Sequence, residues 1–163
     1  MIRLAKIDDL NKIMIIIKDI QKEMAMENNP QWNEEDDYPN KDKFLSDLEK
    51  GELYVYDDGL IKGFMVISKE DNYHEVVEST NKEAYILHRL AIKSDCRGEG
   101  LATKFFEFAE ELAKENNISL LKADTEKHNT KMNALFEKVG FRQKGEFEYD
   151  DYPGHYIYYE KEI

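Results

Sequence analysis

This sequence has little cysteine, and it lacks long hydrophobic runs and a recognisable targeting segment. Among its 163 residues only Cys96 is a cysteine, which excludes an internal disulfide framework and is typical of a reducing cytoplasm. No segment approaches the roughly 18 consecutive apolar residues that cross a bilayer. The opening residues, MIRLAKIDDL, also lack the basic and then apolar layout of a secretory signal. We therefore expect a cytoplasmic protein that does not bind membranes.

Basic residues are few compared with acidic ones. The chain has 23 Lys and Arg against 35 Asp and Glu, so its net charge is −12 at pH 7. Because proteins bind nucleic acid by neutralising phosphates with Lys and Arg, this balance argues against a nucleic-acid partner. It favours a cationic partner or substrate, although solubility alone also accounts for it. The length is typical of one domain, and we predict that residues 1–163 form a single domain.

Hydrophobic periodicity predicts an alternation of strands and helices. Helices are expected at about 10–24, 41–51, 101–112 and 129–140. Strands are expected at about 2–6, 84–92 and 117–125, as a hairpin over 52–68, and as two strands within 141–163. The stretch from Ala84 to Asp124 is a strand–helix–strand crossover, which is normally parallel and right-handed. The fold class is therefore α/β with a mixed sheet.

The segment SDCRGEGLATKFFEFAEELAKE, residues 94–115, begins a helix on two glycines. Glycine costs about 1 kcal/mol relative to alanine in a helix interior, so its use here indicates close approach of the backbone to a ligand. The first amides of a helix lack intrahelical partners, and its N-terminus carries a partial positive charge. Gly98 and Gly100, with Arg97 beside them, predict a cradle for a phosphate or pyrophosphate; a plain tight turn is the alternative. Thr103 stands where a dinucleotide fingerprint needs glycine, and no P-loop motif is present.

Three motifs carry a resemblance to a known family. Arg97, Gly100 and Ala102 match Gln/Arg-x-x-Gly-x-Gly/Ala, NTKMNALFEKVGF is similar to Asn-x-x-Ala-x-x-x-Tyr-x-x-x-Gly-Phe, and YIYYEKEI is similar to a closing strand. In these motifs the chain resembles the GNAT superfamily of N-acetyltransferases. The resemblance extends from Ile2 to the C-terminus. The resemblance implies a mostly antiparallel sheet of about six or seven strands, flanked by about four helices. It also implies acetyl-CoA as co-substrate, no metal, and a homodimer, an assembly common in the family.

The resemblance assigns cofactor binding to two segments and two single residues. The backbone of Leu90, Ala91 and Ile92 would pair with the pantetheine arm as an added strand would. The residues whose amides would hold the pyrophosphate are Arg97, Gly98, Glu99, Gly100, Leu101, Ala102 and Thr103. Asn129 matches an asparagine that hydrogen-bonds pantetheine, and its alternative role is a helix N-cap. Phe136 stands where the family has a tyrosine that often protonates the departing thiolate, and a phenyl ring cannot donate a proton.

Acceptor chemistry rests on side chains outside those segments. His88 lies where the strand would approach the acetyl group and titrates near neutral pH, so it is the leading candidate for the general base. A buried histidine without chemistry is the alternative. Tyr158, on the last strand, is a candidate proton donor in place of the missing tyrosine, or a packing residue. The amine pocket would be lined by Trp32, Tyr38 and Glu27. The alternative for Trp32 is a hydrophobic anchor of its loop, and the alternative for Glu27 is a surface position.

Two functions follow from the sequence. The first is acetyl-CoA-dependent transfer of an acetyl group to a primary amine, on a small molecule or a peptide N-terminus, by direct attack in a ternary complex. The second is a catalytically weak or inactive acyl-CoA-binding module of the same fold, which Phe136 favours. An acidic pocket would accept polyamines, amino acids, aminoglycosides and protein N-termini alike, so the sequence does not identify the amine substrate.

Overall fold

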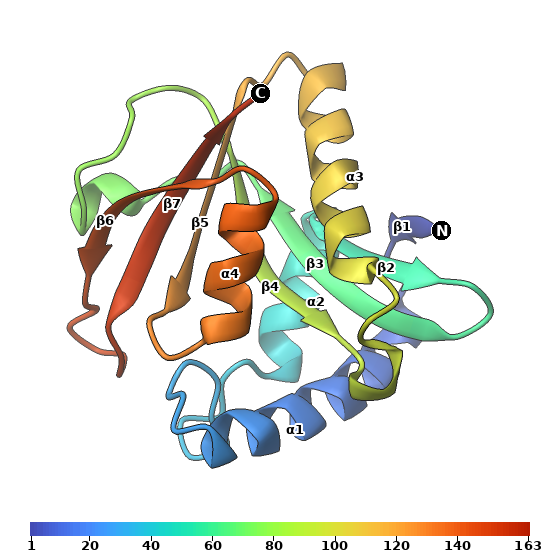
Figure 1. The fold of residues 1–163 in the computed structure, drawn as a ribbon. Coiled ribbons are helices and arrows are strands. Elements are labelled where there is room, and N and C mark those ends of the chain that lie inside the picture. The colour runs from blue at the N-terminus through green and yellow to red at the C-terminus, as the bar shows by residue number, and fades with distance from the viewer.

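The computed structural model describes residues 1–163 as one mixed sheet with four helices (Figure 1). The helices are α1 (Leu10–Met26), α2 (Lys41–Glu49), α3 (Leu101–Glu115) and α4 (Thr130–Lys138). The strands are β1 (Ile2–Leu4), β2 (Leu53–Asp57), β3 (Ile61–Ser68), β4 (Tyr85–Ile92), β5 (Leu120–Glu126), β6 (Arg142–Phe147) and β7 (Tyr156–Glu162). Three short 3₁₀ turns are Ile7–Asp9, Tyr73–Glu75 and Ser94–Cys96. The order of strands and helices agrees with the sequence prediction.

The seven strands are arranged in the order β1-β2-β3-β4-β5-β7-β6. β4 and β5 are the parallel pair, and the chain passes between them through α3, so the predicted crossover is confirmed. The other neighbouring pairs are antiparallel. The sheet is therefore mixed and mostly antiparallel, as the fold class predicted.

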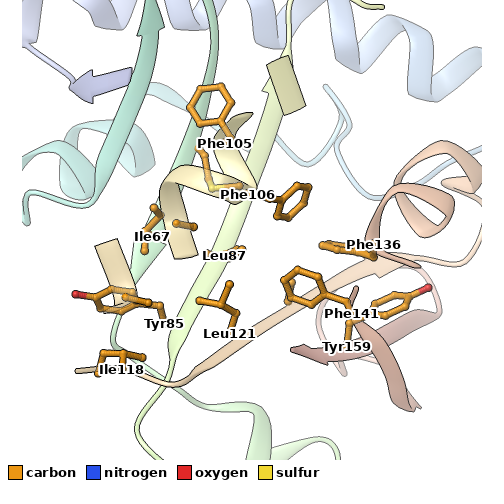
Figure 2. Packing of buried hydrophobic residues seen from close by; sticks show 14 residues of the cluster. Ile67, Tyr85, Leu87, Phe105, Phe106, Ile118, Leu121, Phe136, Phe141 and Tyr159 are labelled. Atoms are coloured by element: carbon orange, nitrogen blue, oxygen red, sulfur yellow. The ribbon is translucent and has the colours of Figure 1, made fainter. Parts of the chain in front are cut away.

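Helices α3 and α4 cover one face of the sheet (Figure 1). Figure 2 shows Phe105 and Phe106 of α3 and Phe136 of α4 among the apolar side chains of the strands, with Leu87 and Leu121 beneath them. All five side chains are almost fully buried. Burial of a Phe or Leu side chain contributes about 1.5–3 kcal/mol, so this cluster accounts for much of the attachment of α3 and α4.

Helices α1 and α2 pack on the opposite face, over β2, β3 and the end of β4. Ile13 and Ile17 of α1 and Phe44 of α2 are fully buried there, and the Phe44 ring meets Phe64 of β3 edge-on at 5.2 Å. Asn40 begins α2 as its N-cap, because its Oδ1 accepts a hydrogen bond of 2.9 Å from the Lys43 amide. No helix combines the length and the apolar character required to cross a membrane.

The segment between β3 and β4, residues 69–84, covers the β5–β7–β6 half of the face that α1 and α2 leave free. Its Tyr73 packs against Phe147 of β6 and Tyr158 of β7, with the Tyr73 and Tyr158 ring centroids 4.6 Å apart. Two layers therefore meet on this face, the α1–α2 layer and the 69–84 segment.

Candidate active site

Strands β4 and β5 separate at the middle of the sheet. Their parallel pairing ends at Leu87 and Ala123, although β4 continues to Ile92 and β5 to Glu126 (Figure 1). The β5 continuation pairs only with β7, so the edge of β4 beyond Leu87 that faces β5 has no strand partner. A strand edge without a partner presents backbone donors and acceptors that an extended ligand can use.

A β-bulge in β4 produces this separation. Arg89 and Leu90 stand opposite the single residue Met65 of β3, and Arg89 has a positive φ of 47°. Such a φ is uncommon outside glycine, and a bulge bends its strand locally. The Arg89 guanidinium donates to Asp47 Oδ2 of α2 at 2.8 and 3.2 Å and to the Tyr38 hydroxyl at 3.2 Å. The charged pair is almost fully buried and holds the bent strand against α2.

The turn before α3 has the backbone of an anion site. Gly98 and Gly100 have φ values of 84° and 74°, and a Cβ on either would meet nothing within 4 Å, so the space beside them is open. The backbone amides of residues 97–103 donate no intramolecular hydrogen bond; the first helical bond of α3 runs from Lys104 N to Gly100 O. Free amides, left-handed glycines and the α3 N-terminus are the backbone features on which the predicted phosphate cradle depends; phosphate binding there stays a prediction.

A groove runs from this cradle along the open edge of β4, and we call it the long groove. Its walls include Leu90, Ala91, Ile92, Arg97, Ala102, Asn129, Glu27 and Trp32. Arg97 pairs with Glu23 of α1 at 2.6 Å across it. Asn129 caps α4 by accepting a bond of 3.2 Å from the Met132 amide, so its N-cap role is confirmed while its side chain still borders the groove.

The long groove continues into a small chamber between β4 and β5. Leu90 and Asn129 border both cavities, and the chamber adds Phe136 of α4. Phe136 is buried, with its ring centroid 4.8 Å from that of Tyr159. The Tyr159 hydroxyl is already engaged, since it donates to Asn133 Oδ1 at 2.6 Å. No hydroxyl therefore occupies the place where the family resemblance expected a tyrosine.

On the other side of the chamber lies a cavity of about 270 Å³ that we call the tyrosine pocket. Its lining includes Trp32, Tyr38, Tyr149, Tyr152, Tyr156, His88, Arg89 and Asp124. Trp32 borders all three cavities, and His88 and Asp124 border both the chamber and the pocket. The three cavities therefore adjoin one another from the α3 cradle to the tyrosines.

Two ionisable groups in the tyrosine pocket have strongly shifted pKa values. Burial raises the pKa of Asp124 to about 6, although the Tyr73 hydroxyl, 2.6 Å from Oδ2, works in the opposite direction by donating to the carboxylate. Burial lowers the pKa of His88 to about 3, and the positive charges of Arg89 and Lys43 add to the effect. At neutral pH the pocket therefore holds an ionised Asp124 and an uncharged, weakly basic His88.

The structure brings most of the predicted site residues to the three cavities, but not all. Gly98, Gly100, Leu101 and Thr103 contribute backbone at the cradle, whereas the Glu99 side chain lies 3.7 Å from Lys62. Tyr158 borders none of the three: it pairs with Asp124 across the β5–β7 ladder, but Tyr73 covers its ring and its buried hydroxyl has no hydrogen-bond partner. Nothing in its position supports proton donation.

Sequence reasoning missed Asp124 and two tyrosines of the pocket. Asp124 lies in a run of buried strand residues, where alternation gave no sign that one carboxylate would face a cavity. Tyr149 and Tyr152 lie in the β6–β7 connection, within a stretch for which the sequence predicts only two final strands. The abundance of tyrosine in EYDDYPGHYIYYE was the available signal.

Comparisons with known proteins agree with this architecture. The model of the acetyltransferase (GNAT) family matches residues 17–141. A GNAT-family acetyltransferase from Streptococcus agalactiae is 28% identical, with a TM-score of 0.86 over 100% of this chain and 95% of that one. A ribosomal-protein-alanine N-acetyltransferase from Brucella melitensis is 21% identical, with a TM-score of 0.73 over 100% and 99% of the two chains.

A further similar structure is yncA from Salmonella typhimurium, solved with its cofactor acetyl-CoA. It is 16% identical, with a TM-score of 0.70 over 99% of this chain and 92% of that one. At such identities the Brucella and Salmonella structures show the fold alone. A comparison with curated protein sequences gives no match. Because the family model covers most of the chain and the fold agrees along its whole length, this chain belongs to the GNAT family of acetyltransferases.

Proposed function

We propose that the protein transfers the acetyl group of acetyl-CoA to a primary amine bound in the tyrosine pocket. The observation that carries this proposal is the continuity of the three cavities: the amide cradle leads along the open edge of β4 to a pocket that holds one ionised carboxylate. A donor anchored at the cradle and an acceptor held by the carboxylate would meet in the chamber between β4 and β5.

The residues present fit acetyl-CoA. The free amides of residues 97–103 would receive the pyrophosphate, and the unpaired edge of β4 at 90–92 would bond to the pantetheine amides. Asn129 would add a side-chain contact beside the same edge. The bound thioester supplies an activated acetyl group with a thiolate leaving group; a free thiol has a pKa of about 8.5. With Phe136 in the chamber, we infer that the thiolate leaves without proton donation from α4.

Asp124 is the group best suited to the acceptor amine. An alkylamine is positively charged in neutral water, and a carboxylate beside tyrosine faces attracts an ammonium group through charge and cation–π interactions. With a pKa of about 6 the Asp124 carboxylate can then take one proton from the bound ammonium, so that the neutral amine attacks the thioester carbon; the second nitrogen proton passes to the departing thiolate. His88 was the sequence-based candidate for this role, but a pKa of about 3 makes it a much weaker base.

The test is thiol release from acetyl-CoA over a panel of mono- and polyamines, with CoA binding measured separately by calorimetry. We expect Asp124→Asn to lower kcat/KM about 10²- to 10⁴-fold without weakening CoA binding, the usual contribution of a general base. We expect kcat/KM to fall along the acidic limb of its pH profile with a midpoint near pH 6, and we expect His88→Gln to leave that midpoint unchanged. If His88→Gln removes that limb and Asp124→Asn does not, His88 is the base and our assignment is wrong.

Phe136 favours one alternative, a module that binds acyl-CoA without turnover. It replaces the expected tyrosine and is buried among Phe106, Phe141 and Tyr159, so the chamber offers no evident acid at this position. Tight CoA binding combined with no thiol release for any amine would support this alternative. Thiol release above the hydrolytic background would exclude it.

A further inference from the structure

The tyrosine pocket is built against a buried polar network that family membership does not explain. Asp124 faces the pocket from β5, and its Oδ2 accepts a hydrogen bond of 2.6 Å from the Tyr73 hydroxyl. Tyr73 does not belong to a strand of the sheet. It comes from the segment 69–84, which connects β3 to β4 along the chain. The distance is in the range of hydrogen bonds between a hydroxyl and an ionised carboxylate.

The segment that carries Tyr73 is fastened by a buried ion pair. Lys122, two residues before Asp124 on β5, is only 1% exposed, and its Nζ donates to Asp71 Oδ2 at 2.6 Å and to Thr80 O at 2.7 Å. The other oxygen of Asp71 accepts from the Tyr73 amide at 3.1 Å. Glu160 of β7 accepts from the amide and the hydroxyl of the same Thr80.

These contacts form one chain of interactions that ends at the pocket. Burying the Lys122 ammonium group at 1% exposure costs free energy unless it is paired, and here, two residues before Asp124 along β5, it is paired with Asp71. Because Lys122 and Asp124 lie on the same face of β5, the ion pair fixes residue 71 directly beside the position from which Tyr73 reaches Asp124. The Tyr73 ring is also packed against Tyr158, which leaves its hydroxyl little freedom.

We propose that Tyr73 is a positioning residue for the acceptor reaction: its hydroxyl holds the Asp124 carboxylate toward the tyrosine pocket, and the Lys122–Asp71 ion pair fixes the segment that carries Tyr73. The proposal rests on the proposed function only in assigning Asp124 to the amine. The hydrogen bond stabilises the charged carboxylate, so it also sets the pH above which Asp124 can bind an ammonium group and accept its proton.

Other ionisable groups around Asp124 must be considered in any pH experiment. They come from β4, β5, the connection before α2 and the β6–β7 arm, and they are His88, Arg89, Glu126, Tyr38, Tyr149, Tyr152 and Tyr156. Burial raises the pKa of Tyr149, Tyr152 and Tyr156, and His88 titrates at about 3. A transition near pH 6 is assigned to Asp124 only where the Asp124→Asn variant removes it.

The experiment is Tyr73→Phe, which keeps the ring and removes only the hydroxyl. Titration of the Asp124 carboxyl carbon by NMR, assigned with Asp124→Asn, should show its pKa raised by about one to two pH units, the change expected for losing a hydrogen bond to a charged group. The acidic limb of kcat/KM should rise by the same amount, with a loss of about tenfold at pH 6 and little loss at pH 9.

Tyr158→Phe is the matched control for the titration. The Tyr158 ring packs against Tyr73, but its buried hydroxyl, which this variant removes, makes no hydrogen bond. It should leave the Asp124 pKa unchanged. The double variant Lys122→Met/Asp71→Asn removes the ion pair without leaving a lone buried charge, and should move the Asp124 pKa in the same direction as Tyr73→Phe.

The outcomes separate this proposal from the proposed function. An Asp124 pKa that stays within a few tenths of a pH unit in both folded variants overturns the positioning role, whatever the activity. An equal loss of kcat/KM at pH 6 and pH 9 also overturns it, because that pattern indicates structural damage. If the wild-type protein turns over no amine while Tyr73→Phe moves the Asp124 pKa, the hydrogen bond stands and the transferase proposal fails.

Discussion

The raised pKa of Asp124 has a consequence for stability that is independent of any substrate. The folded-state pKa is about 6 and the ordinary value is 3.8, so the folded protein binds this proton more tightly than the unfolded chain does. The sign follows directly: ionising Asp124 costs stability as the pH rises from about 4 to about 6, and the cost is constant above that window. A difference of about two pH units corresponds to about 3 kcal/mol.

Asp124→Asn should therefore stabilise the protein at neutral pH while it impairs acetyl transfer. Asparagine keeps the shape and still accepts the Tyr73 hydrogen bond, but it carries no charge to desolvate. Because the pocket is open to water, we expect a gain of about 1–3 kcal/mol in the free energy of unfolding at pH 7.5 and a gain below about 1 kcal/mol at pH 4.

Urea unfolding at the two pH values measures this difference, with Asp150→Asn as the control. Asp150 is an exposed acid near the same pocket and makes no ion pair, so its replacement should change the free energy of unfolding by less than about 0.5 kcal/mol at either pH. A destabilised Asp124→Asn variant at pH 7.5, or a gain that is equal at pH 4, would refute the raised pKa and the burial argument behind it.

Three other perturbations test the remaining parts of the site. Gly100→Ala places a side chain at a φ of 74°, so the free energy of unfolding should fall by about 1 kcal/mol and calorimetry should show weaker CoA binding; unchanged CoA affinity would contradict the cradle. Asp47→Ala leaves the Arg89 charge buried and unpaired, and thermal unfolding should show a loss of about 3–5 kcal/mol; a loss below 1 kcal/mol would mean that the pair does not hold β4. Arg97→Ala breaks only the half-exposed pair with Glu23, so stability should change by less than about 1 kcal/mol while CoA affinity falls; a large stability loss with intact affinity would reverse this assignment.

The fold was largely accessible from sequence because its signals are local. Each helix has apolar residues at helical spacing, and each strand run is bounded by turn residues, so the order of elements and the crossover through α3 were predicted correctly. The backbone of the predicted cradle was accessible for the same reason: Arg97, Gly98 and Gly100 lie within seven adjacent positions, and both glycines have the left-handed φ that their presence indicated.

The acceptor side was less accessible because it is assembled from distant segments. Tyr73, Asp124 and Tyr152 belong to the β3–β4 segment, β5 and the β6–β7 connection, and no spacing along the chain relates them. His88 was found by residue type alone, and its pKa depends on the burial and on the neighbouring positive charges that only the fold supplies. Tyr158 lies on the same face of β7 as Tyr156 but does not border the pocket, because Tyr73, from another segment, covers its ring.

The two halves of the site therefore follow different physical rules. The donor half of the proposed site consists of backbone amides and a strand edge, which would bind a phosphate and an extended chain whatever the nearby side chains are. The proposed acceptor half consists of tyrosine rings and one half-buried carboxylate, which accepts a hydrogen bond from Tyr73 and lies away from the cradle. Substitutions in the tyrosine pocket should accordingly alter which amine is accepted, while substitutions at the cradle should weaken the response to every amine equally. A pocket variant that changes CoA affinity as strongly as Gly100→Ala would show that the halves are coupled.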